Sequence, residues 1–292
     1  MLRALVIFGL AVGAAGEALG SEPGLRPLLG REESVPIKTG QTLHDVAYAH
    51  RVGFQAVERA NPGVDPWIPA PGTNVTLPTR YILPDTDEEG LVINIPEMRL
   101  FDYTVMMGPQ VFAVAIGDEA DRSMIGEFVV GAKRSEPAWH VPKSIREEKP
   151  DLPEVVPPGP DNPLGSRWIT IGRTSYGIHG TNVRWSIGRQ ATHGCVRLYE
   201  DEIQRLYGRV REGTRIQIVY QPTKWGRDRE HLYLEVHPDP YGLRPAGLLQ
   251  SALDAARALG VIDRIDLERV RRAAEQASGI PVAVGSADAP TY

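Results

Sequence analysis

The chain has a single cysteine, Cys195, although its first residues are typical of an exported protein. Arg3 precedes an apolar run from Ala4 to Ala15, and small residues suited to cleavage follow, so we expect a signal peptide over residues 1–20. A lone cysteine has no disulfide partner within the chain, whereas small exported domains commonly rely on disulfides. The chain must therefore be stabilised by an apolar core, which its 292 residues are enough to build.

The apolar run in this leader is shorter than the roughly 20 residues that cross a bilayer, so we expect no stable membrane span. The chain as a whole is 42% apolar and 24% charged, which is usual for a soluble globular protein. Its net charge is −5, and its basic residues are interspersed with acidic ones, which argues against a nucleic acid partner. The length leaves room for about two domains.

Clusters of proline and glycine divide the chain, and the first unit that they delimit spans residues 35–84. Thr42 is placed to cap a helix with Asp45 three residues on, and a second short helix is expected over residues 54–60. A strand is expected over residues 74–77. The predicted order is strand, helix, helix, strand.

Four landmarks of this unit are Gly40-Gln41-Thr42-Leu43, Asn61-Pro62, Pro71-Gly72 and Val75-Thr76-Leu77-Pro78. In this order they resemble a LysM domain, a small βααβ fold. The resemblance implies binding to N-acetylglucosamine-containing glycans, most often peptidoglycan strands, in a shallow groove beside the first helix. The alternative is a small packed spacer without a ligand.

The second unit, residues 90–220, is rich in short β-branched segments that end at glycine or proline. These segments predict a mainly β fold, a largely antiparallel β-sandwich with one helix directly after the cysteine motif. We expect that helix over residues 200–207. The expected strands cover residues 91–95, 98–103, 110–116, 128–130, 168–171 and 215–220.

Cys195 stands close in sequence to His193 and follows a second histidine, His179. A thiol with an ordinary pKa of about 8.5 is mostly protonated at neutral pH, so a nucleophilic cysteine needs a base or a cation beside it. Histidine is the usual base, and its far nitrogen must be held by a third group. No carboxylate lies near His179 in sequence, and Gly180 offers only its backbone.

Three segments around these residues form a long signature: His179-Gly180-Thr181-Asn182, Ser186-Ile187-Gly188 and Thr192-His193-Gly194-Cys195-Val196-Arg197-Leu198. The signature resembles that of the YkuD family, the L,D-transpeptidases. One departure is Ser123-Met124-Ile125-Gly126-Glu127-Phe128, where the family usually has Thr-Pro-x-Gly-x-Phe. We expect this departure to lie in a loop outside the catalytic core and to affect only the fit of the substrate.

The resemblance assigns roles to the residues of the signature. It implies that Cys195 is the nucleophile, that His179 is the general base and that the Gly180 carbonyl orients the imidazole. No metal and no organic cofactor is implied. Three further candidates, for the oxyanion or the substrate, are His193, Gly194 and Arg197.

The function that the resemblance implies is acyl transfer in the periplasm. Cys195 would attack the carbonyl between the diamino acid of a peptidoglycan tetrapeptide stem and its terminal D-alanine, which leaves. An amine would then resolve the thioester, giving a 3-3 cross-link to a second stem or anchoring a lysine-bearing wall lipoprotein. With water as acceptor the same fold would be a hydrolase or carboxypeptidase. A non-catalytic peptidoglycan-binding protein is the remaining alternative.

Other interpretations of the same residues stay open at this point. His179, His193 and Cys195 could hold zinc with an open fourth position, although no acidic residue stands beside them in sequence. His193 could serve only to shape the turn. Arg197 could cap the helix that follows it or pair with Glu200.

The tail, residues 221–292, is expected to add one strand over residues 232–237 and two short amphipathic helices. The first helix has an apolar stripe that includes Ala252, and Asp266 caps the second. We expect both helices to pack on the sandwich, and the final residues to be disordered.

Overall fold

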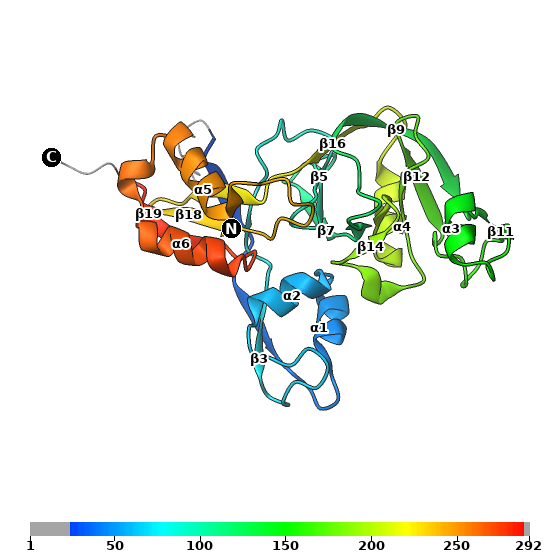
Figure 1. Cartoon of the computed structure of the whole chain (residues 1–292), viewed down its shortest axis with the longest axis horizontal. Coiled ribbons are helices and arrows are strands. Elements are labelled where there is room, and N and C mark those ends of the chain that lie inside the picture. Colours follow the sequence, from blue (N-terminus) through cyan, green and yellow to red (C-terminus); the bar gives the residue numbers. More distant parts are fainter. Residues whose placement is uncertain (1–23, 289–292) are drawn as a thin grey trace, which may run out of the picture.

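The computed structural model describes residues 24–288, so the signal peptide expected over residues 1–20 lies outside the described part. A βααβ unit, a large sheet unit and a C-terminal unit lie next to one another (Figure 1). Strands predominate, which confirms the predicted mainly β class. Within residues 24–288 no helix is both long and apolar enough to cross a membrane.

The large unit is built on an eight-stranded sheet, counted within the described residues. Its strands are β5 (Leu91–Asn94), β6 (Arg99–Asp102), β7 (Gln110–Ala113), β9 (Gly126–Ser135), β12 (Arg167–Ile171), β13 (Gly177–His179), β15 (Val196–Arg197) and β16 (Arg215–Val219). They lie in the order β15-β13-β12-β9-β16-β5-β6-β7. Most neighbours are antiparallel, as predicted, but β16 pairs with β5 and β13 pairs with β15 in parallel.

The main apolar core lies between this sheet and α4 (Glu200–Arg209), the helix predicted after the cysteine motif. Ile93 of β5, Ile169 of β12 and Ile203 of α4 are fully buried. Burying an isoleucine side chain contributes about 1.5–3 kcal/mol, so this shared core holds α4 and the strands in fixed positions.

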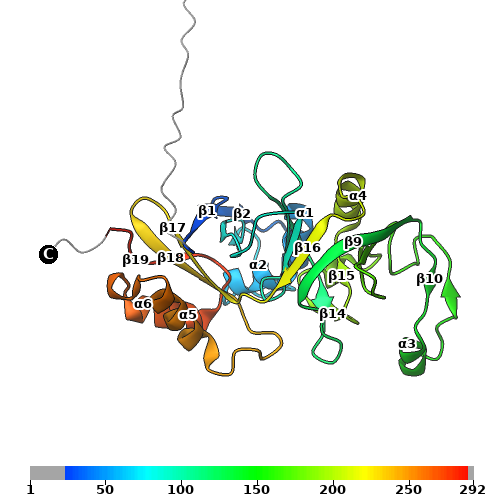
Figure 2. The same ribbon diagram turned by 90° about the horizontal axis from the view of Figure 1, so that it is seen from above.

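Several short elements of the large unit were not predicted. β8 (Ile116–Gly117) pairs with β14 (Gln190–Thr192), and a 3-10 turn, η1 (Arg184–Ser186), precedes β14. β10 (Trp139–His140) and β11 (Val155–Val156) form a hairpin that carries α3 (Lys143–Glu148). This hairpin projects from the end of the molecule (Figure 2). Elements of two or three residues show no periodicity from which they could be predicted.

The first unit follows the predicted order, with β2 (Glu33–Pro36), α1 (Leu43–His50), α2 (Phe54–Ala60) and β3 (Asn74–Leu77). The two strands pair antiparallel. α1 begins with the expected capping box, because Thr42 and Asp45 each accept a hydrogen bond from the other's backbone amide. Leu43 and Val57 are fully buried between the helices and the strand pair.

This βααβ unit contacts the chain between β13 and β15. The Phe54 amide donates a hydrogen bond to the Ile187 carbonyl at 3.2 Å. The Arg189 guanidinium lies 2.8 Å from Nε2 of His44, whose ring stacks on Phe54 with centroids 3.7 Å apart. The unit therefore lies against the segment that joins the histidine motif to the cysteine motif.

The C-terminal unit corrects two expectations. It is a sheet of its own, in the order β19-β18-β17-β1-β4, with α5 (Gly247–Ala258) and α6 (Leu267–Gln276) packed on it rather than on the large sheet. A short turn, η2 (Ile262–Arg264), joins the two helices. Residues Val282–Ser286, which belong to the segment expected to be disordered, form an edge strand of this sheet. The strands are β1 (Arg26–Leu29), β4 (Tyr81–Ile82), β17 (Thr223–Arg227), β18 (His231–Val236) and β19 (Val282–Ser286).

A buried ionic cluster joins the large sheet unit to the C-terminal unit. The Lys224 ammonium lies 2.8 Å from Glu97 and 3.2 Å from Glu235. Arg99 lies 3.1 Å from Glu97 and 3.2 Å from Glu235, and His237 contacts Glu235 at 2.7 Å. Two carboxylates therefore face two cations and one imidazole, so the buried charges are balanced.

Candidate active site

Two short parallel strands bring the histidine and cysteine motifs together. β13 pairs with β15 so that Ile178 lies beside Val196 and His179 lies beside Arg197. Ile178 and Val196 are fully buried in the main core. Because side chains alternate along a strand, His179 and Arg197 lie on the opposite face, together with Cys195, which directly precedes β15.

The His179 ring is buried and held from two directions. Its Nδ1 lies 2.7 Å from the Gly180 carbonyl, and the ring stacks on Trp168 of β12 with centroids 5.5 Å apart. A carbonyl oxygen can only accept, so Nδ1 is assigned the proton and Nε2 keeps the lone pair. Burial, assisted by the positive charge of Arg197, lowers the pKa of His179 to about 3. The imidazole is therefore neutral at physiological pH.

The Cys195 thiol is free and half-buried. Burial raises its pKa, against the opposing effects of a hydrogen bond from the Gly177 backbone and of the Arg197 charge. Among the described residues no hydrogen bond joins this thiol to the His179 ring. The resting site thus holds a neutral thiol and a neutral imidazole, not the thiolate that an adjacent histidine was expected to produce.

Hydrogen bonds fix the turn that carries the cysteine. Thr192 Oγ1 donates to the Cys195 carbonyl at 2.6 Å, and Ser123 Oγ donates to the Gly194 carbonyl at 3.1 Å. Gly194 has φ +92°, and a Cβ there would lie 2.5 Å from the Tyr176 ring, so only glycine fits. The turn is rigid as a result.

The position of Ser123 corrects an expectation. The departure over residues 123–128 was expected to lie away from the catalytic core, yet Ser123 bonds directly to the cysteine turn. Its amide also donates to the Tyr241 hydroxyl at 3.0 Å, and that hydroxyl donates to the Gly117 carbonyl at 2.9 Å. A hydroxyl is what this position requires, and serine supplies one.

The backbone that carries the Gly180 carbonyl packs tightly against α4. A Cβ on Gly180 would lie 2.2 Å from the Glu200 carboxylate, and one on Gly165 would lie 2.3 Å from it. The same carboxylate accepts hydrogen bonds from the amide and the hydroxyl of Ser166. Glu200 is therefore engaged here, and the alternative in which it pairs with Arg197 is wrong.

The Arg197 guanidinium is the uncommitted charge of the site. It forms no hydrogen bond and no ion pair with any side chain of the described residues, and its Nε is buried without a partner. Its charge nevertheless acts on both Cys195 and His179. An unpaired cation beside a thiol is suited to receive an anionic group of a ligand.

The His193 side chain lies at the rim instead of beside the thiol. Its Nε2 is 3.3 Å from the Glu148 carboxylate of α3 and 4.0 Å from that of Asp121. His193 thus links the α3 hairpin to the cysteine turn. In the part of the chain that the structure describes, His179, His193 and Cys195 do not form a group with metal-binding spacing, so the zinc interpretation has no geometric support.

The sequence did not single out Trp168, Glu200, Ser123 or Tyr241 as residues of the site. Trp168 lies opposite His179 through the pairing of β12 with β13, a strand that the sequence did not predict. Ser123 and Tyr241 come from distant parts of the chain. Only the fold reveals them.

Comparisons with known proteins show which family the chain resembles. The family model described as the YkuD L,D-transpeptidase catalytic domain matches residues 88–218. The chain is 34% identical over 267 residues to "Probable L,D-transpeptidase ErfK/SrfK" of Salmonella typhimurium, covering 87% of this chain and 85% of the relative. It is 38% identical over 223 residues to "Probable L,D-transpeptidase YbiS" of Escherichia coli, covering 72% and 71%.

Solved structures are also similar. The catalytic domain of the Enterococcus faecium L,D-transpeptidase, determined by NMR, matches 47% of this chain and 100% of its own length. The sequence identity is 17% and the TM-score is 0.36.

Proposed function

The chain belongs to the YkuD family of L,D-transpeptidases, and from this premise we propose that Cys195 is its nucleophile and His179 its general base. The substrate of the proposed reaction is a peptidoglycan tetrapeptide stem, cut between its diamino acid and the terminal D-alanine. The acceptor is an amine, either of a second stem, giving a 3-3 cross-link, or of a lysine in a protein attached to the wall. The reaction takes place outside the inner membrane, in the periplasm.

One observation supports these roles above the others. The His179 side chain, whose Nε2 we assign as unprotonated, lies on the face of β13 and β15 that also carries Cys195 and the unpaired Arg197. A base, a thiol and a cation on one face are the groups that acyl transfer from a carboxylate-bearing peptide requires.

The proposed first step starts from the neutral pair. As Sγ of Cys195 attacks the scissile carbonyl, its proton passes to Nε2 of His179. The carbon–nitrogen bond then breaks, D-alanine leaves with that proton on its amine, and a thioester remains. We assign the developing oxyanion to the backbone amides of Gly194 and Cys195, in the turn that the Thr192 hydrogen bond fixes.

The second step returns the site to its starting state. The acceptor amine attacks the thioester and gives a proton to His179, and the thiol leaves with that proton. The Gly180 carbonyl balances the imidazolium that forms in each step. Arg197 holds a carboxylate of the stem, and His193 positions the α3 hairpin over the bound peptide.

Three parts of the chain share this function. Residues 35–84 hold a glycan strand as a LysM-like unit, residues 90–220 carry the reaction, and residues 221–292 support the cysteine turn through Tyr241. The leader over residues 1–20 directs export.

The test is incubation with disaccharide-tetrapeptides released from purified sacculi, followed by mass spectrometry. We expect free D-alanine and a dimer with the mass of two tetrapeptide units less one D-alanine. Tripeptide without dimer would identify water as the acceptor and the protein as a carboxypeptidase. The Cys195→Ala variant should give neither product while still binding glycan, and turnover in that variant would refute the assigned nucleophile.

A further inference from the structure

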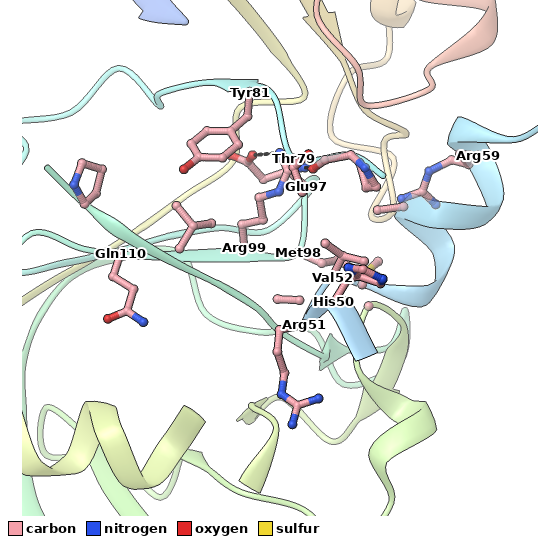
Figure 3. Close-up of a pocket in the computed structure, with 17 residues that line it drawn as sticks. His50, Arg51, Val52, Arg59, Thr79, Tyr81, Glu97, Met98, Arg99 and Gln110 are labelled. Carbon is pink, nitrogen blue, oxygen red and sulfur yellow. Dashed lines mark hydrogen bonds and ion pairs between the residues drawn. The ribbon is translucent and has the colours of Figure 1, made fainter. Parts of the chain in front are cut away.

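A cavity of about 390 Å³ lies between the βααβ unit and the edge of the large sheet (Figure 3). The turn between α1 and α2, the chain at Pro78-Thr79, and strands β6 and β7 form its walls. Gly188, from the segment between the two catalytic motifs, completes it. Neither Cys195 nor His179 lines this cavity, so it is distinct from the proposed active site.

The charged residues that line the cavity are mostly cationic. Arg51, Arg59 and Arg99 line it, against a single carboxylate, Glu97. Arg99 is already paired with Glu97 in the buried ionic cluster. Arg51 is paired with Asp201 at 3.2 Å. One guanidinium, that of Arg59, is left over.

Arg59 is a largely buried cation without a counter-ion. Its side chain extends from α2 toward Thr79 and Glu97 (Figure 3). Within residues 24–288 it forms no hydrogen bond and no ion pair, and its Nε is buried without a partner. Burial lowers its pKa to about 10, so it still carries a charge at neutral pH. An unpaired charge away from water is unfavourable, and an anion in the cavity would compensate it.

The edge of β7 supplies a second binding feature. The Val114 amide donates to the Met98 carbonyl at 2.9 Å, in register with the β6–β7 ladder. Hydrogen bonding alternates along an antiparallel pair, so the backbone groups of Val111 and Ala113 point away from β6. Both residues line the cavity, and no hydrogen bond from another described segment reaches their backbone groups. Such an edge can pair with an added extended peptide.

We propose that this cavity binds an extended, carboxylate-bearing peptide, with its backbone paired to β7 and its carboxylate on Arg59. The inference rests on the proposed function, which makes peptidoglycan stem peptides the acidic peptides that the enzyme meets. The glycan strand held by the βααβ unit carries such stems beside the cavity. The site therefore holds a stem that is not itself reacting and fixes the substrate polymer relative to Cys195.

The site is also connected to the catalytic motif through the backbone. Two residues beyond Ala113, Ala115 forms a β-bridge with Arg197. Its amide donates to the Arg197 carbonyl at 2.9 Å. A peptide on β7 would thus extend the sheet that carries the motif.

The test uses the Cys195→Ala variant, so that no reaction consumes the probe. The probe is a synthetic stem tetrapeptide with free carboxylates, and its control is the same peptide with amidated carboxylates. Hydrogen–deuterium exchange reports the amides of Val111 and Ala113, which face the cavity. We expect the acidic peptide to protect these amides, and adding Arg59→Gln to weaken the binding detected there at least tenfold. The amidated peptide should protect these amides as poorly as the acidic peptide does in the Arg59→Gln variant.

Two further variants sharpen the result. Arg272→Gln removes an exposed charge from α6 and should leave the protection unchanged. Val111→Pro removes an amide that faces the cavity but no bond to β6, so it should fold normally, as a thermal melt will show, and lose peptide binding. Equal protection with Arg59→Gln, or equal protection by the amidated peptide, would overturn the inference.

Failure of this inference can be told apart from failure of the proposed function. Arg59→Gln in a chain with Cys195 intact should be acylated by a carbapenem at the wild-type rate. Acylation without any effect of Arg59→Gln on peptide binding removes the second site and leaves the enzyme mechanism standing. Absence of acylation in the wild type contradicts the mechanism itself.

Discussion

The charge on Arg197 acts on both reacting side chains. It lowers the pKa of Cys195, which favours the thiolate, and it lowers the pKa of His179, which favours the neutral base. Burial opposes the effect on Cys195, because it raises the pKa of the thiol, and it reinforces the lowering of the His179 pKa. The guanidinium thus favours loss of the thiol proton but disfavours its uptake by His179, so the resting enzyme does not form a thiolate–imidazolium pair.

Replacing Arg197 tests this role. In Arg197→Gln the pKa of the thiol should rise, because a positive charge that stabilised the thiolate is gone. Alkylation of Cys195 by iodoacetamide at neutral pH should therefore be several-fold slower, and its pH profile should move to higher pH. Arg272→Gln is the matched control. An unchanged profile in Arg197→Gln would show that this guanidinium does not act on the thiol.

The buried His179 also makes stability depend on pH. Its pKa is about 3 in the folded chain, against an ordinary value of 6.5, so below pH 6.5 the unfolded chain takes up the proton first. The free energy of unfolding should fall by about 2 kcal/mol between pH 7 and pH 5 from this group alone. Urea titrations of the wild type and His179→Gln measure it. If the free energy of unfolding changed equally with pH in the two proteins, the assigned burial of His179 would be contradicted.

The sequence indicated His179 and Cys195 as the candidate reacting residues but did not indicate their electrostatics. The signature around His179 and Cys195 was sufficient to name both. The direction of each pKa shift depends on burial between β12, β13 and α4, which no local pattern encodes. Ser123 shows the same limit, because its bond to Gly194 joins residues that are far apart in sequence.

At the level of elements, the segment between β13 and β15 is clamped by the βααβ unit. Gly188 has φ +79°, and a Cβ on it would lie 2.4 Å from Cα of Gly53 at the start of α2. Two glycines therefore permit the backbones to touch. The contact holds the segment that separates the base from the nucleophile.

Gly188→Ala tests the clamp. The strained φ and the clash should destabilise the protein by about 1–3 kcal/mol and slow acylation of Cys195. Gly208→Ala is the control, because Gly208 lies exposed in α4 with nothing near its Cβ position, and it should stabilise by about 0.5–1 kcal/mol. Denaturant titration checks both. If Gly188→Ala left the stability unchanged, the contact between Gly188 and Gly53 would not be tight.

Element prediction succeeded where segments are long or capped. The Thr42 capping box and the Asp266 cap gave the starts of α1 and α6. β13 and β15 were missed because strands of two or three residues show no alternation, yet they carry the site. The partner strand, not the local sequence, creates them.

At the scale of the whole molecule, the first described strand is joined to the C-terminal unit. β1 pairs in parallel with β17, and the ionic cluster around Lys224 links the C-terminal unit to β6. The tail, expected to add one strand and two helices to the sandwich, instead forms a separate sheet that includes the first described strand. Clusters of proline and glycine suggested where the units begin and end. They could not predict the pairing of β1 with β17, which are far apart in sequence.

Breaking the cluster should weaken the whole fold. Lys224→Met leaves Glu97 and Glu235 with one cation fewer, which should cost about 3–5 kcal/mol. Lys143→Met, at an exposed position in α3, should change stability by less than about 0.5 kcal/mol. Urea unfolding compares them. Similar stability in both variants would show that the cluster does not hold the units together.

The central claim, that Cys195 accepts the acyl group, is tested most directly by intact-protein mass spectrometry after exposure to a carbapenem. We predict one stable adduct on the wild type and none on Cys195→Ala. An adduct of the same mass on Cys195→Ala, or no adduct on the folded wild type, would contradict the account.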